Sequence, residues 1–156
     1  MIGEKMQQDQ EDLYFDDVAI GDELRSSSVR LERSDMIAFA QVWDPLPVHL
    51  DEVAAIAAGF DGLTASGTYL LAVKHRLLYD FGFHRTVMFS FGYDEVRFRA
   101  PGQPNDLVHV QLRWIEKRLS KSRPGTGIAK HLCELTRNDG TVLLSLHDSI
   151  LMRSRA

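Results

Sequence analysis

A change of hydrophobic period near the middle of the chain constrains the fold more than any other feature. Over residues 67–81, apolar side chains recur at helical spacing and cover much of the helix circumference. A helix that is apolar over most of its surface is buried on most sides. Beyond it the period shortens, and strands are expected over residues 87–98, 107–119, 128–137 and 142–152.

The last of these strands is the clearest. Its apolar residues alternate on one face, with Asp148 as the exception: Val142, Leu144, Leu146, Ile150 and Met152. The segment Asn138–Asp139–Gly140 before it is typical of a hairpin turn. One buried helix followed by four antiparallel strands predicts an α+β fold, in which a curved antiparallel sheet wraps a long central helix.

The first half of the chain predicts smaller elements. Residues 23–31 are strand-like, and Ser34 is a candidate N-cap for a helix. The apolar stripe of that helix is expected to lie in the core: Met36, Ile37, Phe39, Ala40 and Trp43. Pro45 and Pro47 end the helix, so residues 44–49 are expected to form an extended or turned loop before a short helix over residues 52–58. We expect a flexible N-terminal arm over residues 1–12 and one domain over residues 13–156.

Composition excludes several classes of function. The 156 residues carry a net charge of -4, and the sequence shows no basic face of the kind that nucleic acid requires. No apolar run approaches the roughly 18 residues of a membrane span. Cys133 is the single cysteine, so no intramolecular disulfide can form. Together with a polar N-terminus that lacks a signal-peptide core, these features lead us to expect a cytoplasmic protein.

The segment Asp44-Pro-Leu-Pro-Val-His49 carries the clearest candidate chemistry. It brings a carboxylate and an imidazole within five residues on a backbone that two prolines stiffen. Histidine exchanges a proton near neutral pH, and a nearby carboxylate can orient it or help to activate water. From the residues alone, a turn-forming aspartate and a surface histidine are the favoured interpretation, because this spacing occurs often by chance.

Three segments in the same order resemble the MaoC-like dehydratases, the family that contains the (R)-specific enoyl-CoA hydratases. The hydratase signature Asp-x-Asn-Pro-x-His is matched at Asp44, Pro47 and His49. Residues 62–67, Gly-Leu-Thr-Ala-Ser-Gly, resemble the entry to the central helix of the family. Residues 95–101 resemble the strand that follows that helix, so that the resemblance covers residues 14–152.

The resemblance implies a hotdog fold and a homodimer or a larger assembly of dimers. It also implies a lyase that hydrates a 2-enoyl thioester or dehydrates a 3-hydroxyacyl thioester, with acyl-CoA or a related thioester as substrate and no cofactor or metal. Asp44 and His49 would bind the water, and the helix start at Ser66 and Gly67 would hold the thioester oxygen. Trp43 would line the acyl pocket. The purely structural alternatives are a simple helix start at Ser66 and Gly67, and a core tryptophan at Trp43.

One position departs from the signature. Leu46 replaces the asparagine, so an amide that could brace the loop is absent. Two other functions therefore stay open. One is a hotdog acyl-CoA thioesterase, and the other is a non-catalytic acyl-thioester binder or structural subunit.

Overall fold

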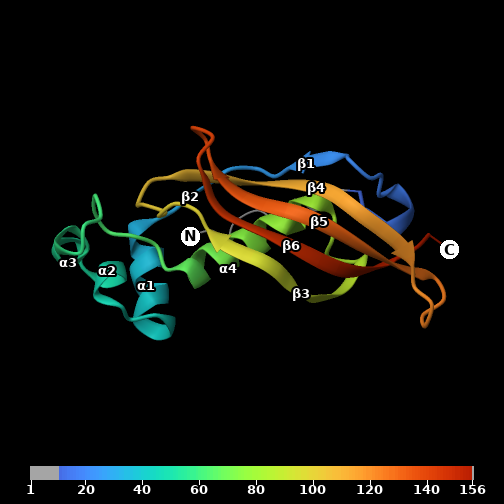
Figure 1. The fold of residues 1–156 in the computed structure, drawn as a ribbon, viewed down its shortest axis with the longest axis horizontal. Coiled ribbons are helices and arrows are strands. Elements are labelled where there is room, and N and C mark those ends of the chain that lie inside the picture. Colours follow the sequence, from blue (N-terminus) through green and yellow to red (C-terminus); the bar gives the residue numbers. More distant parts are fainter. Residues whose placement is uncertain (1–10, 156) are drawn as a thin grey trace.

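A computed structural model describes residues 11–155 of the chain. Its main feature is a six-stranded antiparallel sheet that curls around one long helix, with three short helices grouped at one end (Figure 1). The predicted α+β class, with a long central helix wrapped by a curved sheet, is confirmed. The expected arm over residues 1–12 lies outside the described residues except for its last two.

The elements follow one another with short connections. The first half holds η1 (Phe15–Asp17), β1 (Glu23–Arg25), β2 (Val29–Arg30), α1 (Arg33–Trp43), α2 (Pro47–Leu50) and α3 (Glu52–Ala57). The second half holds α4 (Gly67–Leu78), η2 (Tyr79–Phe81), β3 (Val87–Phe98), β4 (Leu107–Leu119), β5 (Thr126–Arg137) and β6 (Val142–Arg153). Among the helices of residues 11–155, none has the length and hydropathy that a membrane span requires.

The sheet has the order β1-β4-β5-β6-β3, and β2 also pairs with β4. The predicted turn at Asn138–Asp139–Gly140 joins β5 to β6, and Gly140 has a φ of 90°, which glycine adopts without strain. Although β3 precedes β4 in the chain, it pairs with β6 at the far edge of the sheet. The other side of β3 has no strand partner within the described chain.

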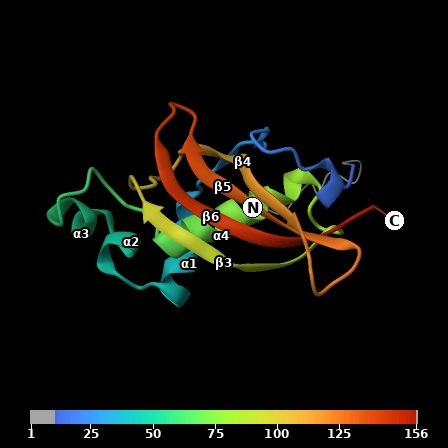
Figure 2. The ribbon, with the colours of Figure 1, turned by 45° about the vertical axis from the view of Figure 1, so that its right-hand side comes forward.

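The core lies between α4 and the concave face of the sheet (Figure 2). Alternate residues of the long strands point into it, as period-2 patterning requires: Val108, Val110, Leu112 and Trp114 on β4, Ala129, Cys133 and Leu135 on β5, and Leu144, Leu146, Ile150 and Met152 on β6. α4 buries Tyr69, Leu70, Val73, Leu77 and Leu78 against them. The predicted burial of the central helix is therefore confirmed.

The N-terminal half differs from expectation in two places. The single strand predicted over residues 23–31 is broken after Arg25, because the Ser26 hydroxyl accepts a hydrogen bond from the Val110 amide at 2.8 Å. This side-chain contact interrupts regular pairing between the strands. α1 begins at Arg33 with Glu32 as its N-cap, so the prediction that Ser34 caps this helix is wrong.

Candidate active site

Asp44 and His49 meet at the junction of α1 and α2. Asp44 is the C-cap of α1, and Pro47 is the first residue of α2. Proline suits a first helical position because its missing amide proton would have no partner there. His49 therefore lies on a helical turn, which corrects the expected loop over residues 44–49. The turn brings the Nε2 of His49 to 3.5 Å from the Oδ2 of Asp44.

The backbone of Thr64 fixes the orientation of His49. The Nδ1 of His49 lies 2.9 Å from the carbonyl oxygen of Thr64. Because a carbonyl only accepts hydrogen bonds, Nδ1 carries a proton, and Nε2 is the nitrogen that faces Asp44. Thr64 was not identified from the sequence, since the contact uses a main-chain oxygen that any residue possesses.

Ser66 connects Asp44 to the start of α4. Its hydroxyl donates to the Oδ2 of Asp44 at 2.6 Å and lies 2.7 Å from the Oγ1 of Thr68. Ser66 is fully buried. A short hydrogen bond to a carboxylate from a buried hydroxyl holds the carboxylate in one orientation. Among the described residues, the Oδ1 of Asp44 accepts no hydrogen bond from the protein.

The N-terminus of α4 opens onto the same place. Ser66 is the N-cap residue, yet its side chain makes no capping bond because it is engaged with Asp44 and Thr68. The first amides of a helix have no intrahelical acceptor, and the helix dipole favours negative charge near them. A Cβ added at Gly67 would lie 2.6 Å from the ring of Phe98, so glycine is what allows this close approach.

These groups border an open pocket of about 440 Å³. Its wall combines the acid–base pair with mainly apolar side chains from α4 and the end of β3. The lining residues are Asp44, His49, Phe60, Thr64, Ala65, Gly67, Thr68, Leu70, Phe98, Arg99, Ala100 and Pro101. Side-chain exposures of 29% for Asp44 and 12% for His49 leave the pair accessible from this pocket. An apolar cavity with few convergent polar groups is typical of a small-molecule site.

The structure brings together four of the five predicted site residues: Asp44, His49, Ser66 and Gly67. Trp43 is not among the residues that line the pocket. It is 72% exposed at the end of α1, so the alternative of a core tryptophan is wrong as well. Leu46, the departure from the signature, is 55% exposed.

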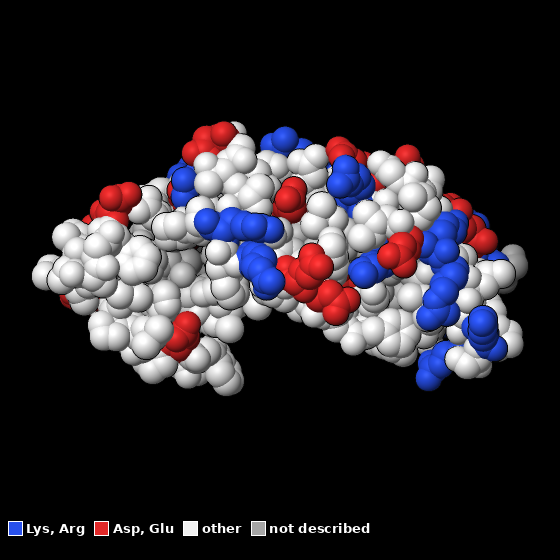
Figure 3. Space-filling model, in the orientation of Figure 1, with Lys and Arg blue, Asp and Glu red and all other residues white. Residues whose placement is uncertain are grey.

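Trp43 and Leu46 belong to an apolar surface on the three short helices. We call this surface the helical-end patch, and its exposed members are Val42, Trp43, Leu46, Val53, Ile56 and Phe60. Figure 3 shows few charged side chains over this end of the molecule. Several exposed apolar side chains at one end of a molecule are typical of a surface that meets another molecule.

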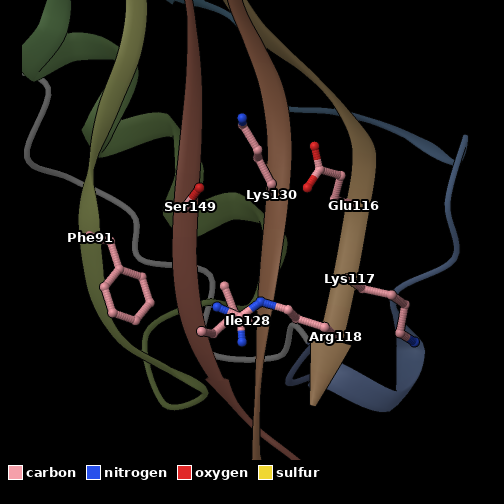
Figure 4. A pocket seen from close by; sticks show the side chains of 7 residues that line it. All are labelled: Phe91, Glu116, Lys117, Arg118, Ile128, Lys130 and Ser149. Carbon is pink, nitrogen blue, oxygen red and sulfur yellow. The ribbon is translucent and has the colours of Figure 1, made fainter. Parts of the chain in front are cut away.

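A different cavity of about 300 Å³ lies on the outer face of the sheet (Figure 4). Its side chains come from four neighbouring strands and mix both charges: Phe91, Glu116, Lys117, Arg118, Ile128, Lys130 and Ser149. It contains no carboxylate–imidazole pair, so the pocket beside Asp44 remains the candidate active site. Among the described residues, no group of three or more His, Cys, Asp or Glu side chains is placed to hold a metal ion.

Comparison with known proteins gives a family match and several similar structures. The profile of the family described as "MaoC like domain" matches residues 16–132. The MaoC-like dehydratase from Rhodospirillum rubrum has a similar structure, with 31% identity, a TM-score of 0.86, and coverage of 92% of this chain and 99% of that one.

Two more distant structures share the fold. The protein Rv0216 from Mycobacterium tuberculosis, described as having a double hotdog fold, superposes with a TM-score of 0.77 at 18% identity, over 92% of this chain and 45% of that one. The R-hydratase PhaJ1 from Pseudomonas aeruginosa gives a TM-score of 0.70 at 20% identity, over 92% and 88% of the two chains. The predicted hotdog fold is therefore confirmed.

Proposed function

Because this chain belongs to the MaoC-like family, we propose that it is a hydro-lyase that adds water reversibly to a 2-enoyl thioester such as an acyl-CoA. The observation that carries the proposal is the convergence of Asp44 and His49 beside the start of α4, with the Nδ1 of His49 bound to a backbone carbonyl. The name of the similar R-hydratase PhaJ1 supports this class of reaction.

In the proposed reaction, a water molecule lies between His49 and Asp44. The unprotonated Nε2 of His49 accepts one hydrogen bond from it, and the free Oδ1 of Asp44 accepts the other. One of these two groups removes a proton as the water oxygen bonds to the β-carbon and the double bond opens. The same proton then passes to the α-carbon, so the reaction leaves the protein in its starting protonation state.

The thioester oxygen gains negative charge as the α-carbon becomes enolate-like. We propose that it lies against the first amides of α4, at Gly67 and Thr68. Preorganised amide donors stabilise such charge most effectively where water is excluded. The absence of a side chain at Gly67 lets the thioester approach the backbone, and the apolar wall of the pocket would hold the acyl chain.

A dimer is part of the proposal, and the outer edge of β3 is the expected contact. This strand lies at the edge of the sheet and exposes a row of large apolar side chains: Met88, Phe89, Phe91, Tyr93 and Phe98. An open, apolar edge strand is a surface that pairs readily with a second copy. Size-exclusion chromatography with light scattering would give the molar mass of the assembly. If this edge is the interface, Phe91→Lys should lower that mass toward the mass of the monomer.

The deciding experiment follows the conjugated absorbance of crotonyl-CoA, a longer straight-chain 2-enoyl-CoA and a branched one. We expect loss of absorbance with at least one of them, and no loss with His49→Ala. His147→Ala is the matched control, because it removes an imidazole from the outer face of the sheet. If both His49→Ala and Asp44→Asn keep wild-type turnover, the mechanism is wrong.

The same experiment separates the two alternatives. A thioesterase would release free thiol from a saturated acyl-CoA, whereas a hydratase leaves the thioester bond intact. A non-catalytic binder would bind acyl-CoA and change none of these substrates. The carboxylate beside a helix N-terminus is compatible with thioester hydrolysis, so thiol release is measured in parallel.

A further inference from the structure

The side chain of Thr68 takes no part in the reaction proposed above, although it lines the same pocket. Thr68 is the second residue of α4, and it is exposed. Its Oγ1 lies 2.7 Å from the Oγ of Ser66, and this contact is the only hydrogen bond of the Thr68 hydroxyl within residues 11–155. What the hydroxyl can do therefore depends on the direction of that bond.

The direction follows from the carboxylate at the other end. Ser66 has one hydroxyl proton and donates it to the Oδ2 of Asp44 at 2.6 Å, because an ionised carboxylate only accepts. Ser66 therefore has no proton left for Thr68. At 2.7 Å the two hydroxyl oxygens are hydrogen-bonded, so the proton between them belongs to Thr68. The three side chains form a chain of donors that runs from Thr68 through Ser66 to Asp44.

Burial isolates the middle of this chain. Ser66 is fully buried, whereas Thr68 is exposed and the side chain of Asp44 is 29% exposed. Water therefore has no access to the Ser66 hydroxyl and does not replace either neighbour. Within the described part of the chain, Asp44 and Thr68 are the two groups that hold this hydroxyl in one orientation.

The bond from Thr68 also makes Ser66 a stronger donor. A hydroxyl that accepts a hydrogen bond is polarised, and the members of such a chain strengthen one another where the local dielectric is low. The bond from Ser66 to Asp44 is of the short, charge-assisted kind that fixes a carboxylate. Rotation of the Asp44 carboxylate is thereby limited, and its Oδ1 stays free for the water.

We infer that Thr68 is a positioning residue, whose hydroxyl acts through Ser66 to hold Asp44 in the orientation that binds water. This inference rests on the proposed function for the role of Asp44. In that reaction the backbone amide of Thr68 also faces the thioester oxygen, so one residue links the place of the thioester to the place of the water. Loss of the hydroxyl should slow turnover without weakening the binding of the thioester.

Thr68→Val removes the hydroxyl and keeps the backbone amide and the branched shape. For any 2-enoyl-CoA that the wild type hydrates, we expect kcat to fall about fivefold with KM unchanged, which corresponds to the loss of one neutral hydrogen bond. Thr68→Ser returns the hydroxyl and should restore most of kcat. Butyryl-CoA has no double bond to hydrate, and calorimetry should show that both variants bind it with wild-type affinity.

Ser66→Ala supplies the background that separates an indirect role from a direct one. If Thr68 acts only through Ser66, adding Thr68→Val to Ser66→Ala should lower kcat no further. Thr141→Val is the matched control, because Thr141 lies just before β6 and is not among the residues that line the pocket. An unchanged kcat in Thr68→Val, a loss that persists in the Ser66→Ala background, weaker binding of butyryl-CoA, or no rescue by Thr68→Ser would overturn the inference.

Urea unfolding tests the chain of donors without reference to catalysis. In Asp44→Ala the Ser66 hydroxyl can still donate to Thr68, and in Thr68→Val it can still donate to Asp44. In the double variant this buried hydroxyl has no partner, which carries the cost of an unsatisfied polar group. We therefore expect the unfolding midpoint of the double variant to lie below the value that the two single variants give by addition.

The two measurements distinguish this inference from the proposed function. A non-additive midpoint with no hydration of any tested 2-enoyl-CoA would support the chain of donors and contradict the hydro-lyase proposal. Hydration by the wild type, together with an additive midpoint or an unchanged kcat in Thr68→Val, would support the hydro-lyase and contradict the positioning role of Thr68.

Discussion

At the scale of single residues, the candidate site depends on groups that act through a neighbour. Ser66 holds Asp44, and the carbonyl of Thr64 holds His49. Neither contact follows from the signature residues themselves. The sequence predicted Asp44 and His49 because their side-chain chemistry is distinctive, whereas a backbone carbonyl carries no sequence signal.

Ser66→Ala tests this positioning role. The substitution removes the 2.6 Å hydrogen bond to Asp44, and we expect kcat/KM to fall roughly tenfold, since a hydrogen bond to a charged group contributes about 1.5 kcal/mol. Ser66→Thr keeps the hydroxyl and should restore most of the rate. A purely structural role would instead lower the free energy of unfolding in Ser66→Ala and leave kcat/KM of the folded fraction unchanged.

Cys133 gives a second prediction at this scale. Burial raises the pKa of its thiol to about 12, so almost no thiolate exists at pH 8. The folded protein should therefore resist iodoacetamide, and one cysteine should be alkylated in urea. Mass spectrometry counts the modified residues, and rapid alkylation of the native protein would show that the core around β5 opens readily.

At the scale of elements, the second half of the chain was predicted closely and the first half was not. The bounds of β3 and β4 agree with the expected ranges, although register shifts interrupt the pairing of both strands and the burial of β3 does not alternate. The region of β1 and β2 departs because the Ser26 hydroxyl accepts the hydrogen bond of the Val110 amide, a tertiary effect that periodicity does not encode. Pro47 was interpreted as a helix breaker, yet at a first helical position it begins one.

Lys74 shows where a sequence signal was present but not used. It interrupts the apolar stripe of the central helix, as Asp148 interrupts the alternation of the last strand. Both breaks fall on buried positions, and the charge of Lys74 is close enough to Asp148 to oppose the rise in its carboxyl pKa that burial causes.

The packing of α4 against the end of β3 gives a prediction for this pair of elements. Gly67→Ala places a methyl group against the Phe98 ring, which is exposed and can turn away. We expect a cost in unfolding free energy of about 1 kcal/mol, at the low end for overpacking, with a larger relative loss of kcat/KM as the ring moves within the pocket. Urea unfolding and steady-state kinetics measure the two effects.

Phe98→Ala provides the control for that prediction. In the double variant Gly67→Ala/Phe98→Ala the clash is gone, so the unfolding cost of Gly67→Ala should disappear when it is measured on the Phe98→Ala background. An additive result would mean that the two residues do not contact each other in solution.

At the scale of the whole molecule, the curved sheet closes over an interior that is not purely apolar. His131 of β5 is fully buried against Trp114, with ring centroids 5.3 Å apart. Its Nε2 lies 4.0 Å from the Oδ2 of Asp148. Desolvation, together with the positive charge of Lys74 and the nearby His147, lowers the pKa of His131 to about 3. The imidazole is therefore neutral in the folded protein, and its contact with Asp148 is not an ion pair at neutral pH.

This buried imidazole makes global stability depend on pH with a defined sign. Because its folded-state pKa of about 3 lies below the ordinary value of 6.5, the unfolded chain binds a proton more readily than the folded one. The stability that His131 contributes is complete above pH 6.5 and declines as the pH falls toward 3. Between pH 7 and 5 the loss should be about 2 kcal/mol, since each pH unit contributes up to roughly 1.4 kcal/mol. Asp148 contributes with the opposite sign, because its raised pKa makes the folded state bind its proton more tightly.

His131→Phe keeps an aromatic ring beside Trp114 and leaves Asp148 in place, so the difference between the two proteins isolates the imidazole. Urea unfolding at pH 7 and pH 5 should show a smaller acid-dependent loss in His131→Phe than in wild type. Parallel losses in the two proteins would mean that the interior admits water and a proton at His131 without unfolding.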